Sequence, residues 1–264
     1  ICACLVGSEM CIRDRYYEYE NVLNAQGEVI GTKERDDISN KWFIGQPIGA
    51  IWDYKVTGIW QKDEVEEAAK YGQRPGDPKV WNNPDNDKVN ADGSVTIVYD
   101  NDDKQFLGQS SPKVNWSMRN EFTFFKDLTF SFNIYSKMGH ESLETDYLNK
   151  DNAGSKVTNG QNVYAKKGYW TVDNPTNEYG RLDAQGPSGV TTPGKLHNRS
   201  FIRLDNISLA YKLPKKFISR WSIEKAIISG SIKNVAVWAK DWKYWDPETG
   251  GLAPRTFNIC LLYT

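Results

Sequence analysis

Cysteine is absent from position 12 to position 259 of this 264-residue chain. The four cysteines, Cys2, Cys4, Cys11 and Cys260, all lie near the two ends. The spacing of the first three fits no standard zinc site, and no histidine accompanies them. We therefore expect no metal site there.

Both ends instead indicate translated adapter DNA. Met10–Asp14 and Cys260–Thr264 can be encoded by two DNA strings that are reverse complements, apart from one base at each end. These strings look like the two orientations of a transposase-type sequencing adapter, and Leu5–Glu9 fits its upstream part. Such segments are excluded from fold reasoning. We expect residues 1–15 and 260–264 to be non-native, and residues 16–259 to be a native segment cut at both ends.

Histidine and enzyme motifs are equally scarce. His140 and His197 are the only histidines, and they lie too far apart in the sequence to suggest a shared metal site. No phosphate-binding loop, helix-opening GxGxxG, Gly-x-Ser-x-Gly or HExxH motif is present. Pairs of carboxylates occur by chance among 34 Asp and Glu residues. We expect no enzyme, no catalytic residue, no bound metal and no cofactor.

Long apolar runs and net charge are also lacking. No stretch of about 18 apolar residues occurs, which excludes a transmembrane helix. The formal charge of −1 argues against a nucleic-acid partner. A transmembrane barrel stays possible, because its strands alternate apolar and polar residues. The aromatic content of 13% fits a membrane-interface girdle with ligand-contacting loops, and it also fits an ordinary all-β secreted domain.

The clearest periodicity lies between Val114 and Ser136, on both sides of a tight connection at Phe125–Asp127. Each arm has about the 9–11 residues that a tilted strand needs to cross a bilayer. In a soluble sandwich the same alternation would place the apolar face in a core. In a barrel, Ser131 and Asn133 would face the lumen. The residues expected to face lipid are Trp116, Phe122, Phe124, Leu128, Phe130, Phe132 and Ile134.

The lengths of the connections favour the barrel. The hairpin has a turn of about three residues on one side, whereas the connections Gln61–Lys113 and Gly139–Arg199 each exceed 50 residues. Outer-membrane barrels have short periplasmic turns and long external loops. Compact soluble domains rarely carry two such long loops.

Two further strands are predicted, at Ser200–Pro214 and Ile223–Lys240. In the first, Ile202 and Leu204 are out of step with Ile207, Leu209 and Tyr211. This slip at Asp205–Asn206 indicates either a β-bulge or a strand that passes from one environment into another. In the second strand, the alternation changes phase at Asn234.

The segment 82–103 is rich in Asp and Asn and could bind calcium. The EF-hand pattern fails, however, because alignment on Gly93 places Lys88 at the first ligand position and Tyr99 at the twelfth. Acidic loops are more often simply solvated. Asp92 is the residue whose mutation would test an ion here.

Four blocks carry a family resemblance, which spans about Gly45 to Ile259. In order along the chain they are GQPIGAIWDYKVTGIW, RPGD, SFIRLDNISLAYKLP, and KNVAVW followed by YWDPE. In combination they resemble SusC/RagA-type TonB-dependent outer-membrane transporters. The threonine usual in the last block is Lys240 or Asp241 here.

The resemblance implies an all-β fold, the carboxyl-terminal part of a 22-stranded antiparallel transmembrane barrel with long extracellular loops. It implies import of oligosaccharides or peptides across the outer membrane of a Gram-negative bacterium. The implied partners are a SusD-like surface lipoprotein, the TonB complex through an amino-terminal part absent here, a glycan or peptide ligand, and outer-membrane lipid. Candidate substrate contacts are Trp242, Tyr244 and Trp245, although such aromatics more often pack at the membrane interface. The alternatives are a secreted carbohydrate-binding β-sandwich and a surface-adhesion fragment.

Overall fold

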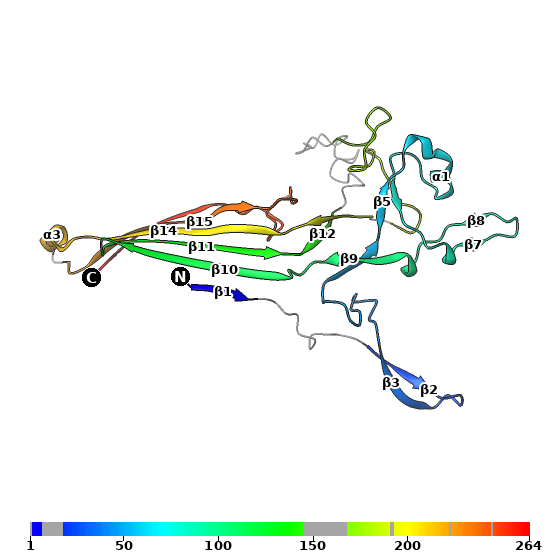
Figure 1. The fold of residues 1–264 in the computed structure, drawn as a ribbon, viewed down its shortest axis with the longest axis horizontal. Coiled ribbons are helices and arrows are strands. Elements are labelled where there is room, and N and C mark those ends of the chain that lie inside the picture. The colour runs from blue at the N-terminus through cyan, green and yellow to red at the C-terminus, as the bar shows by residue number, and fades with distance from the viewer. Residues whose placement is uncertain (1, 7–17, 145–167, 191–192, 222, 244) are drawn as a thin grey trace. The chain divides into compact units, whose positions relative to one another are not determined.

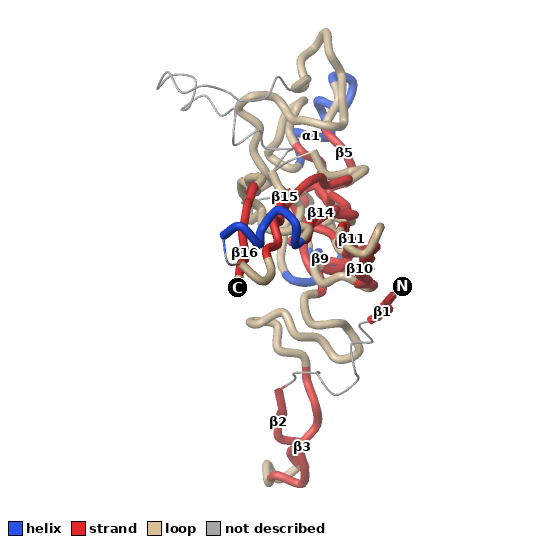
Figure 2. Tube along the Cα trace, turned by 90° about the vertical axis from the view of Figure 1, so that its left-hand side faces the viewer, coloured by secondary structure: helices blue, strands red, loops and turns tan. Residues whose placement is uncertain are grey.

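Alternating residues fold this chain into antiparallel strands, and helices are confined to short turns (Figure 2). A computed structural model describes residues 2–6, 18–144, 168–190, 193–221, 223–243 and 245–264. The chain divides into two units, which we describe separately. The first comprises residues 1–17, 109–141 and 198–264, and the second comprises residues 18–108 and 142–197. No helix among the described residues is both long and apolar enough to span a bilayer.

The first unit is a six-stranded antiparallel sheet, in which β10, β11, β14 and β15 run side by side (Figure 1). The predicted hairpin is confirmed, and its connection is the three residues Phe125–Asp127. The strands and their order across the sheet are β1 (Cys2–Val6), β10 (Val114–Phe124), β11 (Leu128–Met138), β14 (Phe201–Lys212), β15 (Ala226–Trp238) and β16 (Thr256–Tyr263). The short helices α3 (Lys215–Ile218) and η7 (Ser219–Trp221) join β14 to β15.

The two edge strands include residues that the sequence indicates are non-native. β1 pairs with β10, and Cys260 of β16 pairs with Ser229 of β15. Strand pairing uses backbone hydrogen bonds, which any side chain other than proline allows. The non-native origin of these residues therefore stays a prediction.

The bulge predicted in β14 is confirmed. Asn206 pairs with Asn133 and Leu204 with Ile134, so Asp205 is an extra residue relative to β11. Because side chains alternate, one extra residue brings both apolar sets of β14 onto the same face. β15 has its own irregularity opposite Asp205, where Asn234 adopts a left-handed φ of 54°.

The second unit includes most of the two long connections together with residues 18–60. This unit consists of short elements and has a small core that includes Ile59 and Trp170. The described elements are β2 (Glu18–Leu23), β3 (Val29–Arg35), β4 (Ala50–Tyr54), β5 (Val56–Ile59), η2 (Lys62–Glu64), α1 (Val65–Lys70), β6 (Pro78–Val80), η3 (Pro84–Asn86), β7 (Lys88–Val89), β8 (Val95–Thr96), η4 (Asn101–Asp103), β9 (Lys104–Gln109), β12 (Glu141–Glu144) and β13 (Lys195–Asn198).

Asp77, in the RPGD block, joins the two connections. Its side chain is 3% exposed, and Oδ1 accepts hydrogen bonds from Nη2 of Arg181 at 2.8 Å and from the backbone N–H of Gln185 at 2.9 Å. The other carboxylate oxygen accepts from the backbone N–H of Arg74 at 3.0 Å. Gly76 has φ +90°, and an added Cβ would lie 2.6 Å from the Trp170 ring. A buried carboxylate and a close-packed glycine thus explain Asp77 and Gly76 of this block.

We predict that Asp77→Ala loosens the second unit strongly. Removing one partner of a buried ion pair costs about 3–5 kcal/mol, and the variant also leaves the Gln185 and Arg74 amides without their carboxylate acceptor. The measurement is hydrogen exchange of residues 73–80 and 181–185 in the full-length protein. The matched control is Asp183→Ala, because Asp183 also pairs with Arg181 but is 68% exposed, and exposed pairs contribute about 1 kcal/mol at most. Equal exchange in both variants would contradict the role of Asp77.

Candidate functional site

The sheet of the first unit presents one continuous apolar face. Residues that pair directly across antiparallel strands share a face. Phe130 pairs with Phe122 on one side and with Leu209 on the other, and Leu209 pairs with Gly230. No charged residue lies on this face among the described residues of β10, β11, β14 and β15. Its members are Val114, Trp116, Met118, Asn120, Phe122, Phe124, Leu128, Phe130, Phe132, Ile134, Ser136, Met138, Ile202, Leu204, Ile207, Leu209, Tyr211, Ile228, Gly230, Ile232, Ala236 and Trp238.

All seven residues predicted to face lipid lie on this face, and none of them is buried. Phe122 and Phe124 are 42% and 46% exposed. The face also extends beyond the predicted hairpin, since Leu209, Ile228 and Trp238 are exposed as well. Contact with lipid itself stays a prediction.

The opposite face is polar. Ser131 and Asn133 lie on it, as predicted. Ser131 is 7% exposed, and its hydroxyl lies 2.7 Å from that of Ser208 on the neighbouring strand. Asn133 donates to the bulge residue Asp205 at 3.5 Å. On the polar face, side chains of neighbouring strands are thus hydrogen-bonded to each other at some positions rather than hydrated at every position.

A buried arginine fixes the loop 239–255, between β15 and β16, to this polar face. Arg203 is 4% exposed, and its Nη2 lies 2.5 Å from a carboxylate oxygen of Asp246. Nη1 donates to the side chain of Asn234, at the bulge of β15. Asn234 in turn donates to the carbonyl of Ala253 at 2.5 Å. Arg203 and Asn234 together therefore link two strands to the middle and the end of one loop.

Glu248 adds a second set of bonds between the loop and the sheet. It accepts from the Tyr135 hydroxyl at 2.5 Å and from Nζ of Lys137 at 2.7 Å. Arg199 donates to the carbonyl of Pro247 at 3.0 and 2.7 Å. We call these side chains, Tyr135, Lys137, Arg199, Arg203, Asp246 and Glu248, the loop anchor. The DPE motif is visible in the sequence, but its partners are not, because nothing local in the sequence marks Arg203 as the cation for Asp246.

The loop anchor keeps its two acids ionised. Burial alone would raise the pKa of Asp246, but the hydrogen bond from Arg203 and those from the Thr249 and Glu248 amides lower it below its ordinary value. For Glu248, burial is likewise outweighed by the bonds from Lys137 and Tyr135, so its pKa is also lowered.

The structure separates the three candidate substrate contacts. Trp242 is 8% exposed, packs against the Arg199 guanidinium at 4.8 Å, and donates through Nε1 to the carbonyl of Trp245 at 2.8 Å. Trp245 is 53% exposed. Tyr244 lies outside the described residues. Substrate contact stays a prediction for all three, and Trp245 is the one whose side chain is open to a ligand.

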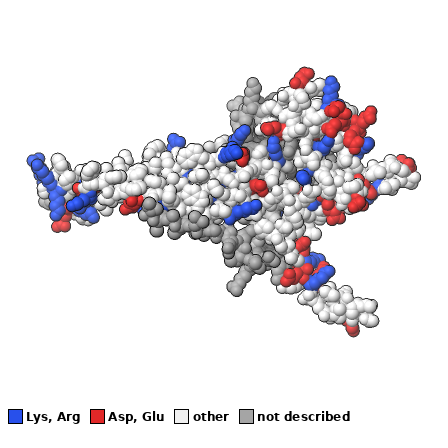
Figure 3. Space-filling view, in the orientation of Figure 1, with Lys and Arg blue, Asp and Glu red and all other residues white. Residues whose placement is uncertain are grey.

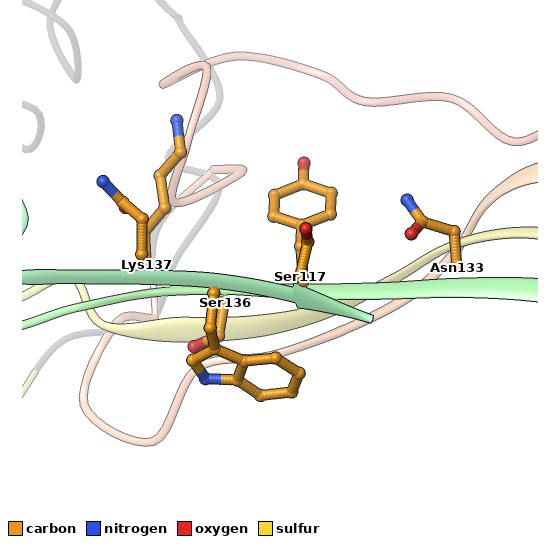
Figure 4. A pocket seen from close by; sticks show the side chains of 7 residues that line it. Ser117, Asn133, Ser136 and Lys137 are labelled. Atoms are coloured by element: carbon orange, nitrogen blue, oxygen red, sulfur yellow. The ribbon is translucent and has the colours of Figure 1, made fainter. Parts of the chain in front are cut away.

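An open pocket of about 340 Å³ lies along the hairpin, and Lys137, Ser117 and Asn133 project on one side of it while Ser136 projects on the other (Figure 4). Lys137 and Tyr135 line it and also hold Glu248. The Asn115 amide oxygen is buried without a hydrogen-bond partner among the described residues. Amides, hydroxyls, an ammonium group and two aromatic rings suit a ligand that offers hydrogen-bonding groups. The lining is Asn115, Trp116, Ser117, Asn133, Tyr135, Ser136 and Lys137.

The acidic segment 82–103 uses its carboxylates internally. Asp103, which is fully buried, accepts from the backbone N–H groups of Asn83 and Asp100 at 2.7 Å each. Asp92 accepts from the amide and hydroxyl of Ser94. Among the described residues, no group of three His, Cys, Asp or Glu side chains could hold a metal ion.

We predict that Asp246→Ala frees the loop 239–255. The variant leaves Arg203 buried without its closest anion, which costs about 3–5 kcal/mol. Protease cleavage within 239–255 should become faster in the full-length protein. The control is Asp241→Ala, because Asp241 lies in the same loop and is exposed. Cleavage at the same rate in both variants would contradict anchoring by Asp246.

The loop should also detach in acid. Asp246 and Glu248 have pKa values lowered from 3.8 and 4.5, so their stabilisation is complete above those values and is lost as the pH falls below them. A spin label on Lys243→Cys should therefore become more mobile below about pH 4. The same label in the Asp246→Asn, Glu248→Gln variant should be mobile at every pH. Constant mobility in the unsubstituted loop from pH 7 to pH 2.5 would refute the linkage.

Comparison with known proteins gives sequence relatives of one kind. TonB-dependent receptor P26 of Formosa agariphila is 26% identical over 216 residues, which cover 80% of this chain and 20% of that protein. TonB-dependent receptor P3 of the same organism is 21% identical over 204 residues, covering 77% of this chain and 19% of the relative. The chain therefore spans about a fifth of the length of these relatives. No protein-family model matches it.

Solved structures share the fold. The RagAB peptide transporter matches with a TM-score of 0.54 and 19% identity, over 83% of this chain and 23% of that one. The RagAB peptide importer in its closed-closed state matches with a TM-score of 0.52 and 20% identity, over 83% and 23% of the two chains. These relatives are receptors and transporters rather than enzymes. The chain is thus similar to part of a SusC/RagA-type TonB-dependent transporter.

Proposed function

We propose that this segment is the carboxyl-terminal part of a 22-stranded outer-membrane barrel that imports a nutrient in a Gram-negative bacterium. The observation that carries the proposal is the uncovered apolar face of four strands, 11 to 13 residues long. Such strands match the length needed to cross a bilayer at a tilt. A membrane satisfies the apolar face, and closure of the barrel satisfies the strand edges.

The polar face would then line the lumen. The loop anchor lies on this side, at the end of the sheet away from the Phe125–Asp127 turn, together with the pocket residues Ser117, Asn133, Tyr135 and Lys137. Short turns face the periplasm in such barrels, so this end would be extracellular. A ligand arriving from outside would meet Trp245 and the pocket first.

We propose a peptide or an oligosaccharide as the substrate. The name of RagAB favours peptides, whereas the exposed Trp245 suits either a peptide side chain or a sugar ring. A SusD-like lipoprotein would be the partner at the outer surface. The TonB complex would supply energy through a part of the protein outside this chain.

The carbohydrate-binding sandwich receives less support. A sandwich buries the apolar face of each sheet against a second sheet. In the part of the first unit that the structure describes, no element covers this face, and the exposure of Phe122 and Leu209 reflects that.

Cysteine labelling of the full-length protein in membranes tests the proposal. Phe122→Cys and Phe130→Cys should react with a lipid-soluble probe and not with a water-soluble one. Thr123→Cys is the matched control, because Thr123 is exposed and lies beside Phe122 on the opposite face. It should show the reverse preference where the lumen is wet. Ser131 is unsuited as the control, since it is buried against Ser208.

Protection of positions 122 and 130 from both probes would mean a protein core and would end the barrel hypothesis. The same result would revive the sandwich.

A further inference from the structure

Cations gather at the end of the sheet where the short turns lie, around α3 (Figure 3). Six are exposed there, against two acids, Asp127 and Glu224, which leaves four net positive charges. None of the six forms an ion pair with another described residue. We call them the turn-end cations: Lys126, Lys212, Lys215, Lys216, Arg220 and Lys225.

The two turns that carry these cations are neighbours. The backbone N–H of Lys212 donates to the carbonyl of Asp127 at 2.8 Å, which joins the hairpin turn to the end of β14. Helix α3 begins three residues later, at Lys215. Lys126 and the α3 cations therefore lie at the same end of the sheet.

Two phenylalanines are exposed among the cations. Phe125 is 94% exposed at the tip of the hairpin, and Phe217 is 66% exposed on α3. Ile218, the next residue, is buried. Helix α3 thus covers Ile218 while it presents Phe217 outward.

The hairpin turn is made of residues that its backbone does not favour. Phe125 and Lys126 have φ values of 50° and 69°, and the Asp127 N–H donates to the Phe124 carbonyl. Positive φ at both central positions is the pattern of a type I′ turn, for which Asn-Gly is strongly preferred. A bulky residue in the left-handed region is strained. A local folding requirement therefore does not explain Phe and Lys at these positions.

We propose that the turn-end cations, with Phe125 and Phe217, form a surface that binds the anionic phosphate headgroups of the membrane leaflet at the turn end. This inference rests on the proposed barrel. The apolar face carries no charge along the strands, and the cations begin where the strands end. That is the depth at which lipid phosphates lie. Clustered Lys and Arg attract anionic headgroups, and exposed aromatic side chains insert at the boundary between headgroups and acyl chains.

A charge-removal series tests the surface in the full-length protein, purified in a zwitterionic detergent. Adding phosphatidylglycerol should raise the melting temperature more than adding phosphatidylcholine at the same mole fraction. Lys126→Gln, Lys215→Gln and Lys216→Gln together should weaken binding of phosphatidylglycerol about a hundredfold, at roughly fivefold per cation. The matched control is the triple variant Lys55→Gln, Lys62→Gln and Lys88→Gln, which removes three exposed cations of the second unit.

The control should keep the preference for the anionic lipid. If both triple variants lose the preference for phosphatidylglycerol equally, the preference depends only on the net charge of the protein, and the proposal is overturned. An unchanged preference in the turn-end variant would also overturn it, and would favour an acidic protein as the partner of these cations.

A second variant separates binding from folding. Phe125→Asn with Lys126→Gly installs the residues that the turn prefers, so the melting temperature without added lipid should be equal or higher. The gain from phosphatidylglycerol should nevertheless fall. If the melting temperature without lipid drops while the increase caused by phosphatidylglycerol stays the same, Phe125 and Lys126 serve only the turn, and the proposed lipid-binding surface is refuted. If the protein is soluble and monodisperse without detergent, the proposed barrel fails instead, which is a separate result.

Discussion

The alternation of side chains along a strand is the constraint on which the first unit depends. Each strand has only two faces, so a single extra residue exchanges them beyond that point. In β14, Ile202 and Leu204 would oppose Ile207 and Leu209 if the strand were regular. The bulge at Asp205 removes the conflict, and the face stays apolar from one end of the strand to the other. The bulges are therefore part of what makes the surface uniform.

The same bulges supply the polar face with its anchor. At a bulge the backbone departs from the ladder, which re-aims the side chains beside it. Asp205 accepts from Asn133, and Asn234 accepts from Arg203 while it donates to Ala253. The irregular positions thus become the places where strands bind each other and the loop. A regular pair of strands would present Asn234 to the apolar side, where its amide would lack partners.

The hairpin could be predicted from the sequence nearly to the residue, whereas the anchor could not. The segment Val114–Ser136 is recognisable because its signal is local, since alternation is read by comparing each residue with those two positions away. The Arg203–Asp246 pair joins residues 43 positions apart, and Asp77 meets Arg181 across 104. Many Asp and Glu residues could pair with either arginine, and only the folded structure determines which one does. The change in the apolar alternation at Asn234 can be read from the sequence, but which residues then lie on the apolar face cannot. In the structure the apolar face continues through Ala236 and Trp238, whereas the sequence pattern favours Val235 and Val237.

A buried ion pair adds little net stability, because desolvation offsets most of the attraction. Its value in this protein is positional. Loop 239–255 could lie in many ways on a polar surface, since serine, asparagine and water offer similar partners everywhere. Arg203 is buried and has one geometry that satisfies Asp246 and Asn234 together, so every other placement of the loop leaves a charge unpaired. The cost of a wrong placement, rather than the strength of the right one, is what orients Trp245 outward and holds Tyr135 and Lys137 beside the pocket.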